Sequence, residues 1–113
     1  MVRSFEFVNS SAKKAFQELP KDIQIQFAND LQRVQEGLQP LSDFKHLKGI
    51  GNGVIELIEN GSPAYRAVYC AKYLDTVFIL HAFTKTTNGV DRKAMDTVQD
   101  RHKTMLQIVK SRK

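Results

Sequence analysis

Apolar and polar residues follow two different periods in the first third of the chain. Residues 3–8 alternate between polar and bulky apolar side chains, the period-two pattern of a half-buried strand. Side-chain oxygens at residues 9–11 can cap a helix, and apolar residues from Ala12 to Leu19 then recur at helical spacing. Pro20 interrupts this helix and opens a second one, whose apolar stripe extends to Leu38. The pattern predicts a strand followed by a helical hairpin.

Three segments rich in β-branched and aromatic residues follow a stretch without a clear period. The stretch, residues 39–53, contains one proline and three glycines and predicts a loop. A loop of this length inside a compact domain usually has a function. The segments Val54–Ile58, Tyr65–Ala71 and Val77–Thr84 are separated by turn-forming residues. They predict an antiparallel meander of three strands.

A final helix is predicted after the turn-forming pair at residues 88–89. Asp91 can cap its N-terminus, and its apolar stripe runs from Met95 to Val109. The predicted order is β-α-α-β-β-β-α in one domain that covers residues 1–113. This is an α+β fold, with a small antiparallel sheet packed on an N-terminal helical hairpin and a C-terminal helix.

Strand pleating sorts the side chains of the meander between two faces. If the helical hairpin covers the more apolar face, Leu57, Leu80 and Ala82 lie beneath it, together with Phe78. The opposite face is then uncovered, and we expect its polar residues to lie close together: Glu56, Arg66, His81 and Lys85.

Composition narrows the possible partners and the compartment. Seventeen Lys and Arg against twelve Asp and Glu give a formal net charge of +5, which favours polyanions such as nucleic acid. The single cysteine, Cys70, cannot form an internal disulfide, which is typical of the cytoplasm. The chain shows no secretory signal and no apolar run of bilayer length, so we expect a soluble protein without a membrane partner.

Three short motifs, taken together, resemble those of a known protein family. They are His-Leu-Lys-Gly followed by glycines and a Glu-Leu pair in residues 46–57, Tyr-Arg-x-x-Tyr in residues 65–69, and His-Ala-Phe-x-Lys in residues 81–85. This set resembles the toxins of type II toxin–antitoxin modules in the RelE/ParE superfamily, most of all the HigB-like, phage Gp49-like branch. The resemblance covers most of the chain and implies a RelE-like fold.

The resemblance implies a metal-independent endoribonuclease that needs no cofactor. Such a toxin cuts mRNA on the ribosome, inhibits translation, and is neutralised by a cognate antitoxin, typically one with a helix-turn-helix domain. Arg66 matches the arginine that stabilises phosphate charge in related toxins, and Lys85 matches a basic position at the end of the last strand. The chain departs from the RelE pattern at Val54 and Glu56, where lysines are expected, and from the HigB-like pattern at Ile58, where most relatives have arginine.

RNA cleavage without a metal needs a proton acceptor, a proton donor and a cation for the phosphate. Arg66 suits the role of the cation because its guanidinium stays charged and binds two oxygens at once. His81 is a candidate acid or base because histidine titrates near neutral pH. Glu56 is either the base or a partner that orients Arg66, and Lys85 either binds phosphate or donates a proton.

Other basic residues are candidates for RNA contact rather than catalysis. His46 and Lys48 lie in the predicted loop and could reach a phosphate, whereas Lys45 reads as an ordinary solvent-exposed lysine. Basic residues of the last helix could dock on ribosomal RNA: Arg92, Lys93, Arg101 and Lys103. His102 and Cys70 are expected to be packed side chains, and the spacing of the histidines does not favour a metal site.

Two alternatives to an mRNA endonuclease remain open from the sequence. A ParE-like protein of the same fold would inhibit DNA gyrase and would not need a proton donor and acceptor. A non-catalytic basic protein would bind structured RNA through its charge alone. The pairing of His81 and Lys85 on one strand favours RNA chemistry over both.

Overall fold

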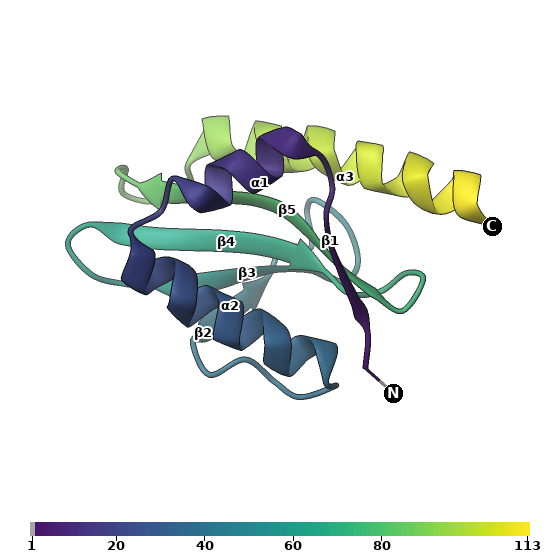
Figure 1. Ribbon diagram of the computed structural model, residues 1–113. Helices are drawn as coiled ribbons and strands as arrows, with labels where there is room; N and C mark the ends of the chain where they lie inside the picture. The colour runs from purple at the N-terminus through teal and green to yellow at the C-terminus, as the bar shows by residue number, and fades with distance from the viewer. Residues whose placement is uncertain (1) are drawn as a thin grey trace.

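One mixed five-stranded sheet and three helices make up the fold in the computed structural model, which describes residues 2–113 (Figure 1). The sheet has the strand order β1-β5-β4-β3-β2. The elements are, in chain order, β1 (Ser4–Phe7), α1 (Ser10–Gln17), α2 (Lys21–Gln35), β2 (Asp43–His46), β3 (Val54–Glu59), β4 (Ala64–Cys70), β5 (Thr76–Lys85) and α3 (Arg92–Arg112). The α+β class, the helical hairpin and the C-terminal helix agree with the prediction.

The helix boundaries follow from local capping chemistry. The side chain of Asn9 accepts a hydrogen bond of 2.8 Å from the backbone N–H of Ala12, and that of Asp91 accepts one of 3.0 Å from Ala94. Each bond satisfies an amide group that the first turn of a helix leaves without a partner. Pro20, whose fixed φ suits a helix start, separates α1 from α2.

The predicted loop at residues 39–53 is wrong in its middle, where Asp43–His46 forms β2. This strand pairs antiparallel with β3, with Lys45 opposite Glu56 and His46 opposite Ile55. Four residues of an edge strand are too few to give a clear period in a sequence rich in turn formers. The strand matters for function because it turns Lys45 toward one face of the sheet and His46 toward the other.

β1 also lies at an edge of the sheet, but it pairs parallel with β5. The prediction placed a strand here without a partner. A parallel pairing needs a long crossover, which α1, α2 and the other three strands provide. The predicted antiparallel meander is confirmed for β3, β4 and β5.

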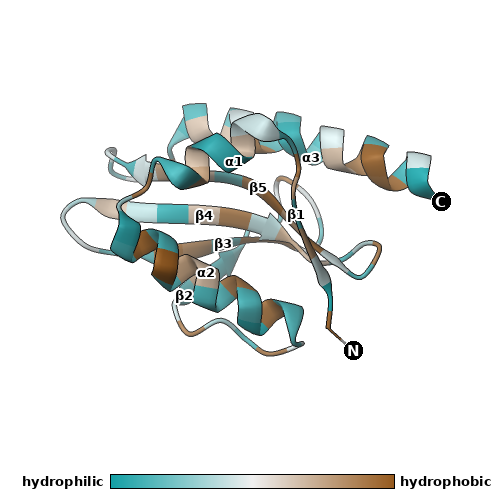
Figure 2. Cartoon of the chain, in the orientation of Figure 1, coloured by the Kyte–Doolittle hydropathy of each residue, from teal (hydrophilic) through white to brown (hydrophobic). Residues whose placement is uncertain are grey.

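Both faces of the sheet carry an apolar core, which corrects the expectation of an uncovered face. Figure 2 shows apolar residues running through the central strands. On one face Leu57 and Ala82 pack against residues of α1 and α2 such as Phe27. On the other face Val68 and Phe78 pack against residues of α3. The helical stripe of α3 required such a partner surface, and the apolar residues of alternate strand positions supply it. No helix among the described residues has the length and apolar character needed to cross a bilayer.

A β-bulge in β5 explains why Phe78 and Leu80 lie on the α3 face instead of beneath the hairpin. Val68 of β4 pairs with His81, whereas the next residue, Tyr69, pairs with Ile79. Leu80 is therefore an extra residue, and the strict alternation used for the prediction fails at this point. Beyond the bulge the alternation resumes, so His81 faces α3 while Ala82 lies in the hairpin core, as expected.

Candidate functional site

Three adjoining hollows lie on the α3 face of the sheet, around the N-terminal part of α3. We name them after one residue each: the Arg66 hollow of about 330 Å³, the Lys45 hollow of about 70 Å³ and the His81 hollow of about 250 Å³. Lys85 lines the first two and Phe83 lines the last two, so neighbouring hollows share a lining residue. Five cationic residues line it and are called the basic strip: Lys45, Arg66, Lys85, Lys93 and Arg101.

Arg66 is held in a fixed position although it carries a full charge. Only 6% of its surface is exposed. Its guanidinium donates hydrogen bonds to the backbone oxygens of Tyr65, at 3.0 Å, and Glu59, at 3.4 Å, and to the side-chain oxygen of Asn60, at 3.1 Å. These acceptors lie at the β3–β4 turn, so the turn fixes the guanidinium beside the Arg66 hollow, which Arg66 lines.

Glu56 links Arg66 to Lys45 through its carboxylate. Its Oε1 lies 3.7 Å from Nε of Arg66 and 3.5 Å from Nζ of Lys45. Glu56 is 4% exposed, and burying a carboxylate costs free energy unless cations lie beside it. This geometry fits the expectation that Glu56 orients Arg66. Lys45, by contrast, is a site residue that the sequence analysis treated as ordinary, because β2 was not predicted.

Lys85 differs from Arg66 because its charged group makes no bond to the rest of the described chain. It lies at the C-terminal end of β5, opposite Ala64, and borders both the Arg66 and the Lys45 hollows. Within residues 2–113 no hydrogen bond or ion pair engages its ammonium group. Lys85 can therefore direct all three of its N–H donors at a bound anion.

His81 lines the third hollow and contacts the guanidinium of Arg101. Nη1 of Arg101 lies 2.9 Å from Nδ1 of His81, and the imidazole stacks on Phe83 with ring centroids 5.3 Å apart. Burial lowers the pKa of His81 to about 4, and the Arg101 charge acts in the same direction, against a smaller opposing effect of Asp91. The imidazole is thus neutral at physiological pH.

The structure separates other candidates from the basic strip. His46 follows the alternation of β2 to the hairpin face, where it lines a different hollow with Phe44 and Ile55. Lys48 is exposed in the turn after β2 and does not line the three hollows, and the same holds for Arg92 and Lys103 on α3. Lys93 and Arg101 do line the His81 hollow.

The remaining two candidates are packed side chains, as expected. Cys70 is fully buried against the α3 core, and burial raises the pKa of its thiol. His102 is 9% exposed and lies against Gly51, where an added Cβ would come within 2.6 Å of the imidazole Cε1. No group of three His, Cys, Asp or Glu side chains in residues 2–113 could hold a metal ion.

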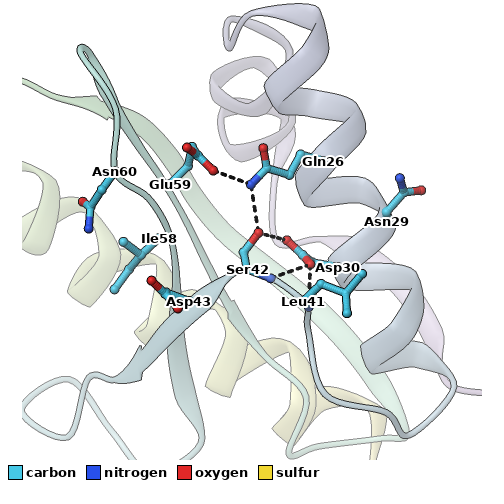
Figure 3. Close-up of a pocket in the computed structure, with 9 residues that line it drawn as sticks. All are labelled: Gln26, Asn29, Asp30, Leu41, Ser42, Asp43, Ile58, Glu59 and Asn60. Atoms are coloured by element: carbon cyan, nitrogen blue, oxygen red, sulfur yellow. Dashed lines mark hydrogen bonds between the residues drawn. The ribbon is translucent and has the colours of Figure 1, made fainter.

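A hollow larger than these three lies at the β2 edge of the sheet and is acidic. This acidic pocket, of about 470 Å³, lies between α2, β2 and the end of β3 and is lined by Asp30, Asp43 and Glu59 (Figure 3). Its side chains bind one another: Asp30 accepts a bond of 2.6 Å from the hydroxyl of Ser42, and Gln26 donates one of 2.7 Å to Glu59. Three carboxylates repel a polyanion, so size does not make this pocket the nucleic-acid site.

A comparison with known protein families assigns the chain to a family. The family described as phage-derived protein Gp49-like (DUF891) matches residues 14–103, which is most of the chain. The chain belongs to this family. Gp49-like proteins form a RelE/HigB-like toxin family, as the sequence motifs predicted, and such toxins pair with antitoxins. A search among curated proteins finds no significant match. Membership of the Gp49-like family thus supports a toxin, while the chemistry must be argued from the basic strip.

Proposed function

We propose that this Gp49-like protein is the toxin of a type II toxin–antitoxin module and acts as a ribosome-dependent mRNA endonuclease. The observation that carries the proposal is the placement of Arg66 and Lys85 on one polar hollow of about 330 Å³ at the end of the sheet. A fixed guanidinium and an unengaged ammonium together suit a phosphodiester whose negative charge increases during the reaction.

The cleavage would follow the usual course of metal-independent RNA transesterification, which leaves a 2′,3′-cyclic phosphate and a free 5′-hydroxyl. The 2′-hydroxyl loses its proton and attacks the adjacent phosphorus, and the bond to the 5′-oxygen breaks as that oxygen gains a proton. Arg66, held in place by Glu56 and the β3–β4 turn, would bind the phosphate oxygens. Lys85 would neutralise the departing oxygen or donate its proton.

The proton acceptor is the weakest part of the site in the free protein. Glu56 is engaged by Lys45 and Arg66, and Nδ1 of His81 is engaged by Arg101. We therefore expect the isolated protein to cleave RNA slowly and the ribosome to complete the site, either by supplying an acceptor or by orienting the 2′-hydroxyl.

The rest of the basic surface would contribute to docking. Lys93 and Arg101 extend the basic strip along α3, and Arg92 and Lys103 are exposed on the same helix. Such cations attract ribosomal RNA and mRNA through counterion release. A cognate antitoxin, which we expect to carry a helix-turn-helix domain, would neutralise the toxin by covering this strip, and the site of action would be the cytoplasm.

Induced expression followed by mapping of transcript 5′ ends tests the proposal. The wild-type protein should arrest growth and produce cuts within translated codons. Lys85→Ala should reduce both effects at least tenfold, because it removes a cation from the phosphate site. The matched control is Lys110→Ala, which removes an exposed lysine of α3 outside the three hollows and should stay as toxic as the wild type.

The same experiment separates the alternatives. Growth arrest with filamentation, damaged DNA and intact transcripts would indicate a gyrase inhibitor and would overturn the proposal. Retention of RNA without cut ends, in cells and with ribosomes present, would indicate a non-catalytic RNA-binding protein. A fully toxic Lys85→Ala would show that the assigned site is wrong.

A further inference from the structure

The contact between His81 and Arg101 joins β5 to α3 and fixes the protonation pattern of the imidazole. Nη1 of Arg101 lies 2.9 Å from Nδ1 of His81 and 3.2 Å from the backbone oxygen of Leu80. A guanidinium has N–H donors and no acceptor, so Nδ1 must accept the hydrogen bond. The single proton of the neutral ring is then on Nε2.

The orientation of the ring is fixed by two further features. The bulge at Leu80 turns His81 toward α3 and brings the Leu80 oxygen within reach of the same guanidinium. The imidazole stacks on Phe83 at an interplanar angle of 23°. Both rings and Arg101 line one hollow of about 250 Å³ together with Lys93, so the imidazole borders space that a ligand can enter.

The charges around His81 keep it neutral. From α3 it faces Arg101, with Lys93 in the same hollow, and from the residue that caps this helix it faces Asp91. Its partner across the sheet is the apolar Val68. Burial and the Arg101 charge oppose a proton on Nδ1, and the Asp91 carboxylate favours one.

We propose that Arg101 is a positioning residue that holds His81 in the neutral Nε2–H tautomer, so that the imidazole acts in its hollow as a hydrogen-bond donor to an RNA phosphate or ribose oxygen. The identity of the ligand rests on the proposed function, whereas the tautomer rests on the geometry alone. His81 then binds and orients the RNA, and it does not accept the proton of the 2′-hydroxyl, because the nitrogen that could accept a proton is occupied.

Long-range ¹⁵N–¹H correlation spectra of the folded protein test the tautomer directly. His81→Gln assigns the His81 signals among those of the three histidines. In the wild type we expect the Nε2–H pattern at pH 7 and no titration of His81 above pH 5. An Nδ1–H pattern, or a titration midpoint near the ordinary value of about 6.5, would overturn the proposal.

Arg101→Ala tests whether Arg101 is the cause. We expect a mixture of tautomers and a rise of the His81 midpoint by more than one pH unit, while Lys110→Ala leaves both unchanged. An Arg101→Ala protein with an unaltered tautomer and midpoint would exclude Arg101 as the positioning residue. The remaining backbone amide signals report whether the variant is folded, and Arg101→Lys provides a second variant that keeps the charge but has no forked donor.

A functional readout separates this inference from the proposed function. With ribosomes and mRNA, the cleavage rate of Arg101→Ala should fall at least fivefold and gain a pH dependence that follows the raised His81 midpoint. An unchanged rate and pH profile would overturn the positioning role. If the wild-type protein cuts no mRNA, the proposed function fails, whereas the tautomer is still decided by the spectra.

Discussion

The acidic pocket lies beside α2 at the β2 edge of the sheet, the basic strip lies on the α3 face, and the two regions use their charges differently. In the acidic pocket, Asp30 is 2% exposed and accepts bonds from the backbone N–H groups of Leu41 and Ser42 and from the Ser42 hydroxyl. Its carboxylate is fully engaged in hydrogen bonds that join α2 to the segment before β2. In the basic strip, Lys85 and Lys93 border open hollows, and no internal hydrogen bond or ion pair among the described residues uses their donors.

The comparison teaches that neither the size of a hollow nor the number of charges around it identifies a site. What matters is whether those charges retain unused bonding capacity after the fold has formed. Arg66 is the intermediate case, because it is bound within the fold and still lines the Arg66 hollow. The comparison therefore predicts which substitutions reduce stability and which reduce only the binding of RNA.

The largest effect is expected for Arg66→Ala. This substitution leaves the buried carboxylate of Glu56 with the exposed Lys45 as its cation, and such a loss costs about 3 to 5 kcal/mol of unfolding free energy. Urea denaturation measures it. Lys45→Ala, which removes the exposed partner, should cost under about 1 kcal/mol.

A double substitution serves as the control for Arg66. Arg66→Met combined with Glu56→Leu removes both buried charges and should recover most of the stability that Arg66→Ala loses, while the protein stays inactive. A stable Arg66→Ala would mean that Arg66 belongs with Lys85 as a free cation, and the intermediate position assigned to it would be wrong.

Asp30→Ala should produce the next largest loss, about 2 to 3 kcal/mol. The substitution leaves two backbone N–H groups and a hydroxyl without their charged acceptor. Asp43→Ala makes the same change of net charge at an exposed position of the acidic pocket and should change stability by less than about 0.5 kcal/mol. Urea denaturation measures both losses of unfolding free energy. Equal losses for the two variants would contradict the view that the hydrogen bonds of Asp30 stabilise the fold.

Acidification should lower the free energy of unfolding through protonation of His81. Its pKa is about 4 in the folded protein and near 6.5 when unfolded, so the unfolded chain binds more protons between these values. Stability is therefore complete above pH 6.5 and falls as the pH decreases toward 4. Allowing for the partial exposure of His81, the loss at pH 5 should be on the order of 1 kcal/mol.

His102 contributes in the same direction, since burial also lowers its pKa. Thermal melts of the wild type and His81→Gln between pH 7 and pH 5 separate the two groups. The variant should lose less stability over this range than the wild type does. Identical pH profiles would mean that His81 does not titrate in this way.

Much of the fold could be predicted from the sequence, because the period of apolar residues in α1, α2, α3 and the central strands is long enough to be unambiguous. The capping roles of Asn9 and Asp91 could also be predicted, since their chemistry is local. The four-residue β2 and the bulge at Leu80 could not, because each is decided by strand pairing with residues distant in sequence.

The same two features limited the prediction of the site. Without β2, Lys45 and His46 could not be assigned to opposite faces, and His46 was expected near the phosphate instead of Lys45. Arg101 was expected to contact RNA, but its hydrogen bond to His81 depends on how α3 docks on the sheet, which no local pattern encodes. Arg66 and Lys85 come together as expected, because both follow the regular alternation of strands that pair directly.

The smallest effects on stability are expected for Lys85 and Lys93, the cations of the basic strip without an internal partner in residues 2–113. They give the clearest test of the difference between the basic strip and the acidic pocket. Lys85→Ala and Lys93→Ala should each change the unfolding free energy by less than about 0.5 kcal/mol. If each lysine neutralises one phosphate, each variant should lower the slope of log affinity against log salt by about 0.7, measured with a 2′-O-methyl RNA that cannot be cleaved. Asp43→Ala in the acidic pocket should leave that slope unchanged, because its side chain lines none of the three hollows of the basic strip. A slope that responds to Asp43 as strongly as to Lys85 would show that RNA follows the net charge of the whole molecule, and the basic strip would then have no special role in binding.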